Sequence, residues 1–257
     1  MEIKNIKEVF MKYSKNYEKS GRLNLKINHI LRVALNAKMI GESLMLSEEE
    51  IILCYLIGIC HDIGRFEQIR LFNTFSDNDS GIDHASYSNH ILFDDGLINE
   101  FLCDEKYYSI IKKAVYNHNK IKLEDNLSEK EKLFCNIIRD ADKLDILNVL
   151  TIEDKKNIYW NDNFDINSIN NKLIEQLKNY QLIDYKDIKN NADLIIAFYD
   201  YAYDFNFEKS YEIIKENDYY NKYLENIKND FKEYVYIQAK EINDFINKYI
   251  DNKIKKI

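Results

Sequence analysis

Proline is absent from this chain of 257 residues, and its six glycines all fall between Gly21 and Gly96. A fold rich in β-strands needs many tight turns, and tight turns depend heavily on these two residue types. Their scarcity therefore argues against a β-rich fold. Long stretches rich in Lys, Glu, Asn, Ile, Leu and Tyr instead predict helices joined by polar loops. We expect an all-α protein.

Other features that are missing narrow the function. The four cysteines show no CxxC spacing and no secretory segment precedes them, so we expect a reducing, cytoplasmic setting. The net charge is −8 and there is no basic stripe, which predicts no binding to nucleic acid. The most apolar run, residues 51–60, is too short to span a membrane. A phosphorylated ligand would therefore need local cations or a metal.

Hydrophobic periodicity divides the first part of the chain into helices. Ser47 with Glu50 and Ser128 with Glu131 form two capping boxes, and the first opens a helix that is apolar on every side. Residues 70–83 predict a long loop. The expected helices cover residues 3–18, a segment from near His29 to 46, residues 48–60, a segment from 83–84 to 94–96, residues 104–118, and a segment from 129 through at least 145.

The composition changes near residue 150, where histidine disappears and Tyr, Asn and Phe increase. We expect a helical core in residues 1–150 and a C-terminal helical extension, residues 151–257, packed on that core. The Tyr-rich segment 198–203 could stack on a nucleobase or cover a site, although aromatic residues at helical spacing more often belong to a core. Trp160 leaves similar alternatives open.

The pair His61-Asp62 ends the most apolar predicted helix. A carboxylate in such a place faces a penalty of several kcal/mol unless it is paired, hydrogen-bonded or bound to metal. Arg65 is the nearest basic residue, so a helix end with a salt bridge is one interpretation. On its own the dipeptide is weak evidence for a metal site.

Three more histidines strengthen the metal interpretation. His29, His84 and His118 lie at the ends or on the apolar sides of other predicted helices, from which they could point into the same core. Imidazoles and carboxylates together suit divalent first-row metals. Ligands that project inward from different helices of a bundle can build a site for two metals.

In this order, the residues resemble the HD-domain superfamily of metal-dependent phosphohydrolases. The pattern of that family is an early His, a His-Asp doublet and a later Asp, and the matching residues are His29, His61-Asp62 and Asp142. Residues 61–65 read HDIGR and residues 141–144 read ADKL, both similar to segments of the family. The resemblance covers about residues 25–149 and implies an HD-domain helical bundle with a C-terminal helical extension.

The resemblance also implies a ligand set and a reaction. Asp62 would bridge two divalent ions, which could be manganese, iron, nickel, zinc or magnesium. The implied reaction is hydrolysis of a phosphomonoester or phosphodiester in a small, nucleotide-like substrate by metal-activated hydroxide. Arg65 and Lys143 are the cations expected at the phosphoryl oxygens, with salt bridges to nearby carboxylates as their alternative. One ion would be held by His29, His61, Asp62 and Asp142, and the other by Asp62, His84 and His118.

Several alternatives stay open. His90 competes with His84, but six positions along a helix turn it to another face, where it would be a surface or packing residue. Asp140 competes with Asp142, and only the ADKL resemblance selects Asp142. Asp140 and Asp145 could orient ligands or be solvated helix charges. HD-fold enzymes of the inositol-oxygenase type use the same ligands to hold two irons, so a di-iron oxygenase is the alternative function, and a metal-binding regulator is a third.

Overall fold

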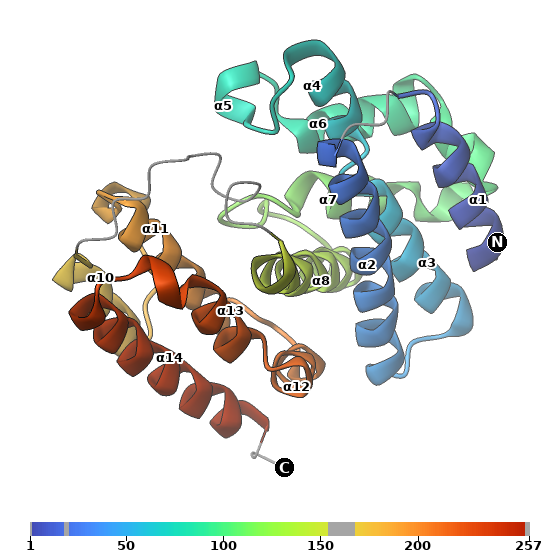
Figure 1. The fold of residues 1–257 in the computed structure, drawn as a ribbon. Helices are drawn as coiled ribbons and strands as arrows, with labels where there is room; N and C mark the ends of the chain where they lie inside the picture. Colours follow the sequence, from blue (N-terminus) through green and yellow to red (C-terminus); the bar gives the residue numbers. More distant parts are fainter. Residues whose placement is uncertain (1, 18–20, 154–167, 255–257) are drawn as a thin grey trace. The chain divides into compact units, whose positions relative to one another are not determined.

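The computed structural model describes residues 2–17, 21–153 and 168–254, apart from the side chain of Arg22. Within these ranges the chain is helical and contains no strand, which confirms the all-α prediction (Figure 1). Trp160 lies outside the described residues. The chain divides into two compact units, Met1–Asp145 and Ile146–Ile257, and each is described by itself. The packing of the C-terminal extension on the core stays a prediction.

The N-terminal unit is built from helices on either side of a buried central one. They are α1 (Ile3–Ser14), α2 (Gly21–Ser43), α3 (Glu48–Cys60), α4 (Gly64–Phe72), α5 (Asp77–Ser80), α6 (His84–Asn89), the π-helix η1 (His90–Asp94), the 3-10 helices η2 (Leu97–Phe101) and η3 (Glu105–Tyr107), α7 (Tyr108–Asn117), and the first part of α8 (Glu129–Ile152).

Helix α3 is the centre of this unit, as its uniformly apolar sequence predicts. Every residue from Leu53 to Cys60 is buried. It packs most extensively against α2, which lies beside it (Figure 1). The two helices approach closely at Gly58, where an added Cβ would lie 2.5 Å from the Cα of Ala34. The close crossing brings the end of α3 next to the side chains of α2.

Both predicted capping boxes are present. The side chain of Ser47 accepts a hydrogen bond from the backbone N–H of Glu50, and the Glu50 carboxylate accepts one from the Ser47 backbone in return. Ser128 and Glu131 make the same pair of bonds at the start of α8. These caps satisfy amides that have no partner inside a helix. They therefore fix the starts of α3, which ends just before His61, and of α8, which carries Asp142.

Three predicted boundaries are wrong. Helix α2 begins at Gly21 rather than near His29. The buried side chain of Leu23 continues its apolar face in the N-terminal direction, so His29 lies inside the helix. The first helix ends at Ser14, short of residue 18. The predicted loop 70–83 contains the end of α4 and the short helix α5, which Ser76 caps by accepting a hydrogen bond from the backbone of Asp79.

The C-terminal unit is also helical. It contains the end of α8, α10 (Asn171–Lys178), η4 (Tyr185–Asp187), α11 (Asn191–Ala197), η5 (Phe198–Tyr203), α12 (Glu208–Asn217), α13 (Tyr219–Ile227), η6 (Lys228–Asp230) and α14 (Glu233–Ile254). Its core is rich in tyrosine: the rings of Tyr199 and Tyr220 stack with centroids 5.1 Å apart, and the hydroxyl of Tyr199 donates to the buried Asn243 at 3.3 Å. In the Tyr-rich segment, Tyr199 is thus a core residue.

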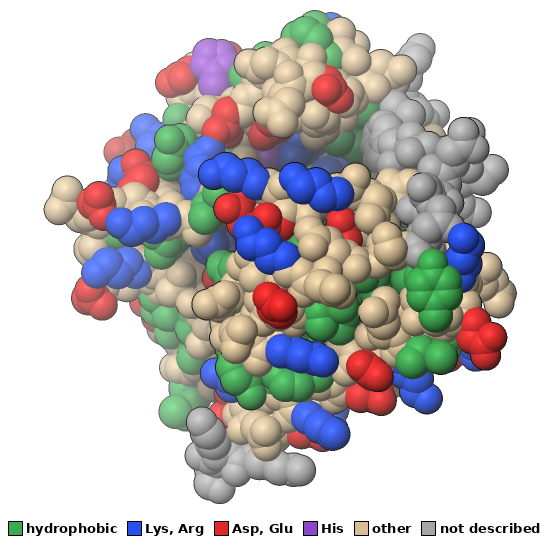
Figure 2. Space-filling model, turned by 90° about the vertical axis from the view of Figure 1, so that its left-hand side faces the viewer, with side chains coloured by type: hydrophobic (Ala, Val, Ile, Leu, Met, Phe, Trp, Pro, Cys, Tyr) green, Lys and Arg blue, Asp and Glu red, His purple; other side chains and the backbone are tan. Residues whose placement is uncertain are grey.

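Two surface-related expectations can be compared with the structure. None of the described helices has both the length and the hydrophobicity that crossing a membrane requires. On the face shown in Figure 2, basic and acidic side chains are interspersed, as the sequence suggests. The four cysteines are buried as free thiols.

Candidate metal centre

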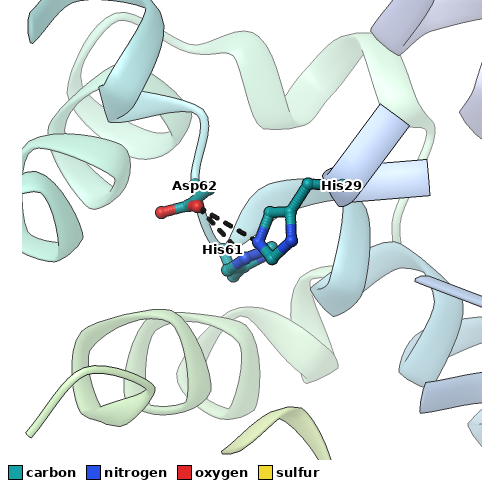
Figure 3. A group of neighbouring side chains, drawn as sticks. All are labelled: His29, His61 and Asp62. Atoms are coloured by element: carbon teal, nitrogen blue, oxygen red, sulfur yellow. Dashed lines mark ion pairs between the residues drawn. The ribbon is translucent and has the colours of Figure 1, made fainter. Parts of the chain in front are cut away.

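The side chains predicted to bind metal meet in the interior of the N-terminal unit. Figure 3 shows three of them, His29, His61 and Asp62, with ion pairs from the carboxylate to both rings. All the predicted ligands are buried except Asp142, which is partly exposed. They come from five places in the chain: α2 (His29), the turn after α3 (His61 and Asp62), the first residue of α6 (His84), the residue after α7 (His118) and α8 (Asp142).

The carboxylate of Asp62 lies between two pairs of imidazoles. Its Oδ2 atom is 3.4 Å from Nε2 of His61 and 3.6 Å from Nε2 of His29. Its Oδ1 atom is 3.3 Å from Nε2 of His84 and 3.7 Å from Nε2 of His118. Each oxygen therefore faces a different pair of rings, which is the arrangement that a bridging carboxylate needs.

Asp142 completes the half of the cluster around His29 and His61. Its Oδ1 atom lies 3.1 Å from Nε2 of His29 and 3.8 Å from Nε2 of His61. Its neighbour Asp140 is buried, so it is not a solvated helix charge, but among the described residues its carboxylate joins no set of three possible metal ligands. The geometry thus brings Asp142 into the cluster in preference to Asp140.

All four rings present the same nitrogen to the cluster, because the other nitrogen is engaged. In each ring Nδ1 lies 2.7 Å from an oxygen that can only accept a hydrogen bond, so in the neutral ring Nδ1 carries the proton and Nε2 carries a lone pair. The accepting groups are the Asp145 carboxylate for His29, the Gly58 carbonyl for His61, the Asp77 carboxylate for His84 and the Val115 carbonyl for His118.

Two of these contacts follow directly from helix geometry. His61 is the first residue after α3, and His118 is the first after α7. The last carbonyls of a helix have no partner inside the helix, and each ring donates to the carbonyl three residues before it. A histidine at a helix end can therefore satisfy an unpaired carbonyl and present a fixed lone pair to its surroundings.

Several of the ligand atoms that face one another in the cluster lack any hydrogen-bond partner among the described residues. These atoms include Nε2 of His29 and of His61 and Oδ1 of Asp62, all buried. The Nε2 atoms of His84 and His118 lie 3.0 Å apart. Two lone pairs that face each other at this distance repel, and each buried polar atom without a partner costs about 1–3 kcal/mol.

A divalent cation would remove this conflict, and the spacing of the atoms fits one. Two nitrogen ligands at about 2.1 Å from one ion are about 3.0–3.4 Å apart for angles between a right angle and the tetrahedral angle. The separation of 3.0 Å between His84 and His118, and that of 3.4 Å between His61 and Asp62, fall within this interval. The residues present therefore fit a metal site, and the two halves around Asp62 fit two ions.

Most of the titratable groups are in the form that metals bind. Burial lowers the pKa of His61 and takes that of His84 to about 4, so both rings are neutral at neutral pH. Burial opposes the ionisation of Asp62, but Lys26 and His61 outweigh it and hold the pKa of this carboxyl well below its usual range. Partial burial opposes the ionisation of Asp142, but the neighbouring histidine rings outweigh it and lower the pKa of this carboxyl. Neutral imidazole and ionised carboxylate are the forms that coordinate.

His29 is the exception. Burial and Lys26 act against its protonation, but Asp142 and Asp145 outweigh them and raise the pKa of the ring. A proton and a metal ion therefore compete for its Nε2 atom, because a ring that coordinates a metal cannot keep a proton there.

Outside the ligands, the structure reveals carboxylates that hold the rings. The sequence left Asp145 undecided between an orienting role and a solvated charge. It is buried, and its carboxylate lies 2.7 Å from Nδ1 of His29 and 2.5 Å from Nε of Arg32. Asp77 was missed because it lies in the predicted loop. It accepts from His84 at 2.7 Å and from Gln68 at 2.9 Å. Partners of this kind orient metal-binding imidazoles.

Of the two cations predicted for phosphate, Arg65 is held firmly by its neighbours. Its Nη1 atom donates to Gln68 at 2.6 Å, to Asp77 at 2.7 Å and to the carbonyl of Phe75. Its Nε atom is buried, lies 3.6 Å from Oδ1 of Asp62 and has no hydrogen-bond partner in the described part of the chain. Lys143 is partly exposed on α8. The contacts of these two residues with a substrate stay predictions.

His90 lies on the surface, as expected from its place on the helix. Its side chain is 50% exposed and pairs with Asp94 at 2.9 Å. Of the two histidines, His84 is the one that is buried and lies within the cluster.

Gly64, the glycine of the HDIG sequence, brings α6 against the turn that carries His61 and Asp62. Its backbone N–H donates to the hydroxyl of Ser88 at 2.8 Å, and that hydroxyl lies 3.0 Å from the carbonyl of His61. An added Cβ at Gly64 would lie 2.5 Å from the carbonyl oxygen of His84. Only a glycine permits this approach, which sets His84 opposite Asp62.

Comparison with known proteins gives one family. Residues 27–147 match the family model of the HD domain, and this span contains every predicted metal ligand. Searches of curated proteins and of solved structures found no match.

Proposed function

We propose that this chain, whose residues 27–147 belong to the HD domain family of mostly metal-dependent hydrolases, is a phosphohydrolase. Its substrate would be a small phosphomonoester or phosphodiester of nucleotide-like character. The net charge of −8 favours a small phosphorylated ligand over a long polyanion.

The observation that carries this proposal is the carboxylate of Asp62, which faces one pair of imidazoles with each oxygen. Divalent ions, when bound, lower the pKa of water and so supply a nucleophile near neutral pH. The chain contributes the rest. Asp145 and Asp77 fix the rings of His29 and His84 by accepting hydrogen bonds from their Nδ1–H groups, so the ligand atoms are already oriented before a substrate arrives.

Positive charge next to the ligand set favours an anionic substrate. The ammonium of Lys26 donates to Oδ2 of Asp62, and Nε of Arg65 lies 3.6 Å from Oδ1 of the same carboxylate. A phosphoryl group gains negative charge at its oxygens during hydrolysis, and nearby cations stabilise that charge. An oxygenase with the same ligands has no phosphoryl charge to stabilise, so these two cations support phosphate chemistry.

The test is to purify the protein without oxygen, measure its metal content, and assay a panel of phosphate esters with and without oxygen. We expect phosphate release that does not depend on oxygen and that is lost in His84→Ala and His118→Ala. His90→Ala is the matched control, because His90 is a surface histidine in the same unit, and it should keep full activity. Asp62→Ala should lose metal and activity together.

The contrary outcome is equally clear. Two irons per chain, consumption of oxygen and no phosphate release would replace the phosphohydrolase with the di-iron oxygenase. Full metal stoichiometry in Asp62→Ala would show that Asp62 is not the bridge.

A further inference from the structure

Lys26 lies beside the candidate metal centre, although nothing in the sequence marks it. It precedes His29 by three residues in α2, so the two side chains share a face of the helix. Its side chain is only 16% exposed, and its ammonium donates a hydrogen bond to Oδ2 of Asp62. Among the described residues, Asp62 is the one hydrogen-bond acceptor that Lys26 contacts, and the ring of Phe75 lies 5.7 Å from the ammonium.

The other cation next to Asp62 has a different task. The Nη1 atom of Arg65 is shared among Gln68, Asp77 and the carbonyl of Phe75. Through these bonds Arg65 fixes Asp77, which in turn holds Nδ1 of His84. Arg65 is therefore a positioning residue for the half of the cluster that contains His84. Lys26 lies on the opposite oxygen of Asp62, with His29 and His61.

We propose that Lys26 is the substrate-binding cation of this centre and that it binds an anionic phosphoryl oxygen; this rests on the proposed phosphohydrolase function. An ammonium has three N–H donors, and Asp62 takes one of them. A carboxylate oxygen has two lone pairs, so Lys26 and a metal ion can share Oδ2. Because the Lys26 side chain is 16% exposed beside Oδ2 of Asp62, the donors that remain are available to a phosphoryl group held next to that carboxylate.

A purely structural role predicts something different. A lysine that served only to neutralise the buried charge of Asp62 would become dispensable once metal ions supplied that charge. A lysine that binds substrate matters most in the metal-loaded protein. The two roles can therefore be separated by measuring ligand binding after metal has been added.

The experiment titrates inorganic phosphate into the manganese-loaded protein by calorimetry, with metal content and thermal unfolding measured on the same samples. Lys26→Met removes the charge and keeps the length of the side chain, and Lys26→Arg keeps the charge. Lys38→Met is the matched control, because Lys38 lies in the same helix and pairs with Glu42 away from the cluster.

We expect Lys26→Met to bind phosphate about 10- to 100-fold more weakly, the range for loss of one charge-assisted hydrogen bond. Its metal stoichiometry should be unchanged, Lys26→Arg should stay within about tenfold of the wild type, and Lys38→Met should equal it. Because a folding failure of the methionine variant would obscure the result, Lys26→Gln serves as a second neutral variant with the same expectation.

Each contrary result has one meaning. If the wild type binds phosphate and the neutral variants bind it equally well, Lys26 is not the substrate-binding cation, while the proposed function stands. If the neutral variants lose metal together with phosphate, Lys26 has a structural role and the inference is overturned. If the wild type neither binds phosphate nor releases it from esters, the proposed function fails, and the inference fails with it.

Discussion

Asp77 offers a test of the two halves of the metal centre, because it contacts only one of them. The carboxylate accepts from Nδ1 of His84 at 2.7 Å and from Nη1 of Arg65 at 2.7 Å, and it touches neither His29 nor His61. Asp77→Ala should therefore weaken the binding of one metal ion and leave the binding of the other unchanged. Loss of a carboxylate that orients a ligating imidazole typically costs about 10- to 100-fold in metal affinity.

The expected change in stability is smaller than the change in metal binding. Asp77 is 31% exposed, so water can replace much of what its carboxylate provides. We expect the metal-free variant to lose about 1 kcal/mol of unfolding free energy, the usual net value of one such hydrogen bond. The metal-binding effect should therefore be visible in a protein that is still folded.

The assay is equilibrium dialysis or calorimetry with manganese, which resolves two binding steps. For Asp77→Ala we expect one step at the wild-type affinity and one that is 10- to 100-fold weaker, as is usual for such orienting partners. Asp79→Ala is the control, because Asp79 is exposed in the same short helix. Asp145→Ala should give the reciprocal result by weakening the binding of the ion next to His29. Equal weakening of both steps in Asp77→Ala, or no weakening at all, would refute the division of the centre at Asp62.

Three further predictions concern stability. With metal removed by chelation, denaturant unfolding should show that the free energy of unfolding falls as the pH drops from 6.5 towards 4. His84 is protonated at its ordinary pKa of 6.5 in the unfolded chain, but only at a pKa of about 4 in the folded chain. The unfolded state therefore holds more protons between these values, which lowers stability by up to about 1.4 kcal/mol per pH unit. A flat profile, or an equal slope in His84→Asn, would contradict this. Gly64→Ala should lose about 1–3 kcal/mol in urea unfolding, because its new Cβ would lie 2.5 Å from a backbone oxygen, whereas Gly21→Ala, with nothing within 4 Å, should not. Ser47→Ala should lose about 1 kcal/mol with the capping box, measured as a lower melting temperature.

The residues that meet in the cluster could be predicted from the sequence because histidine is rare in this chain and informative. Histidine occurs five times in the chain, and four of these residues meet in the cluster. The glycine of HDIG is likewise explained by a close approach that no other residue permits. The helical class could be predicted from composition, because the absence of proline and the small number of glycines do not depend on contacts between distant residues.

The residues that support the ligands could not be predicted in this way. Lys26 and Asp62 are 36 positions apart in the sequence, and His29 and Asp145 are 116 positions apart. Lysine and aspartate are common on helix surfaces, so only the tertiary structure shows that these ones are buried partners. Asp77 was hidden further by its place in a segment that reads as a loop.

The ends of α3 and α7 have an electrostatic consequence of their own. His61 and His118 are the C-terminal caps of these helices, so both helices direct their C-terminal ends at the cluster. Each helix end carries roughly half a negative charge from its aligned peptide dipoles. Together they add about one elementary negative charge that comes from the backbone alone. This charge adds to that of the carboxylates of Asp62 and Asp142 and so favours a divalent cation between them, and replacing any single ligand leaves it in place.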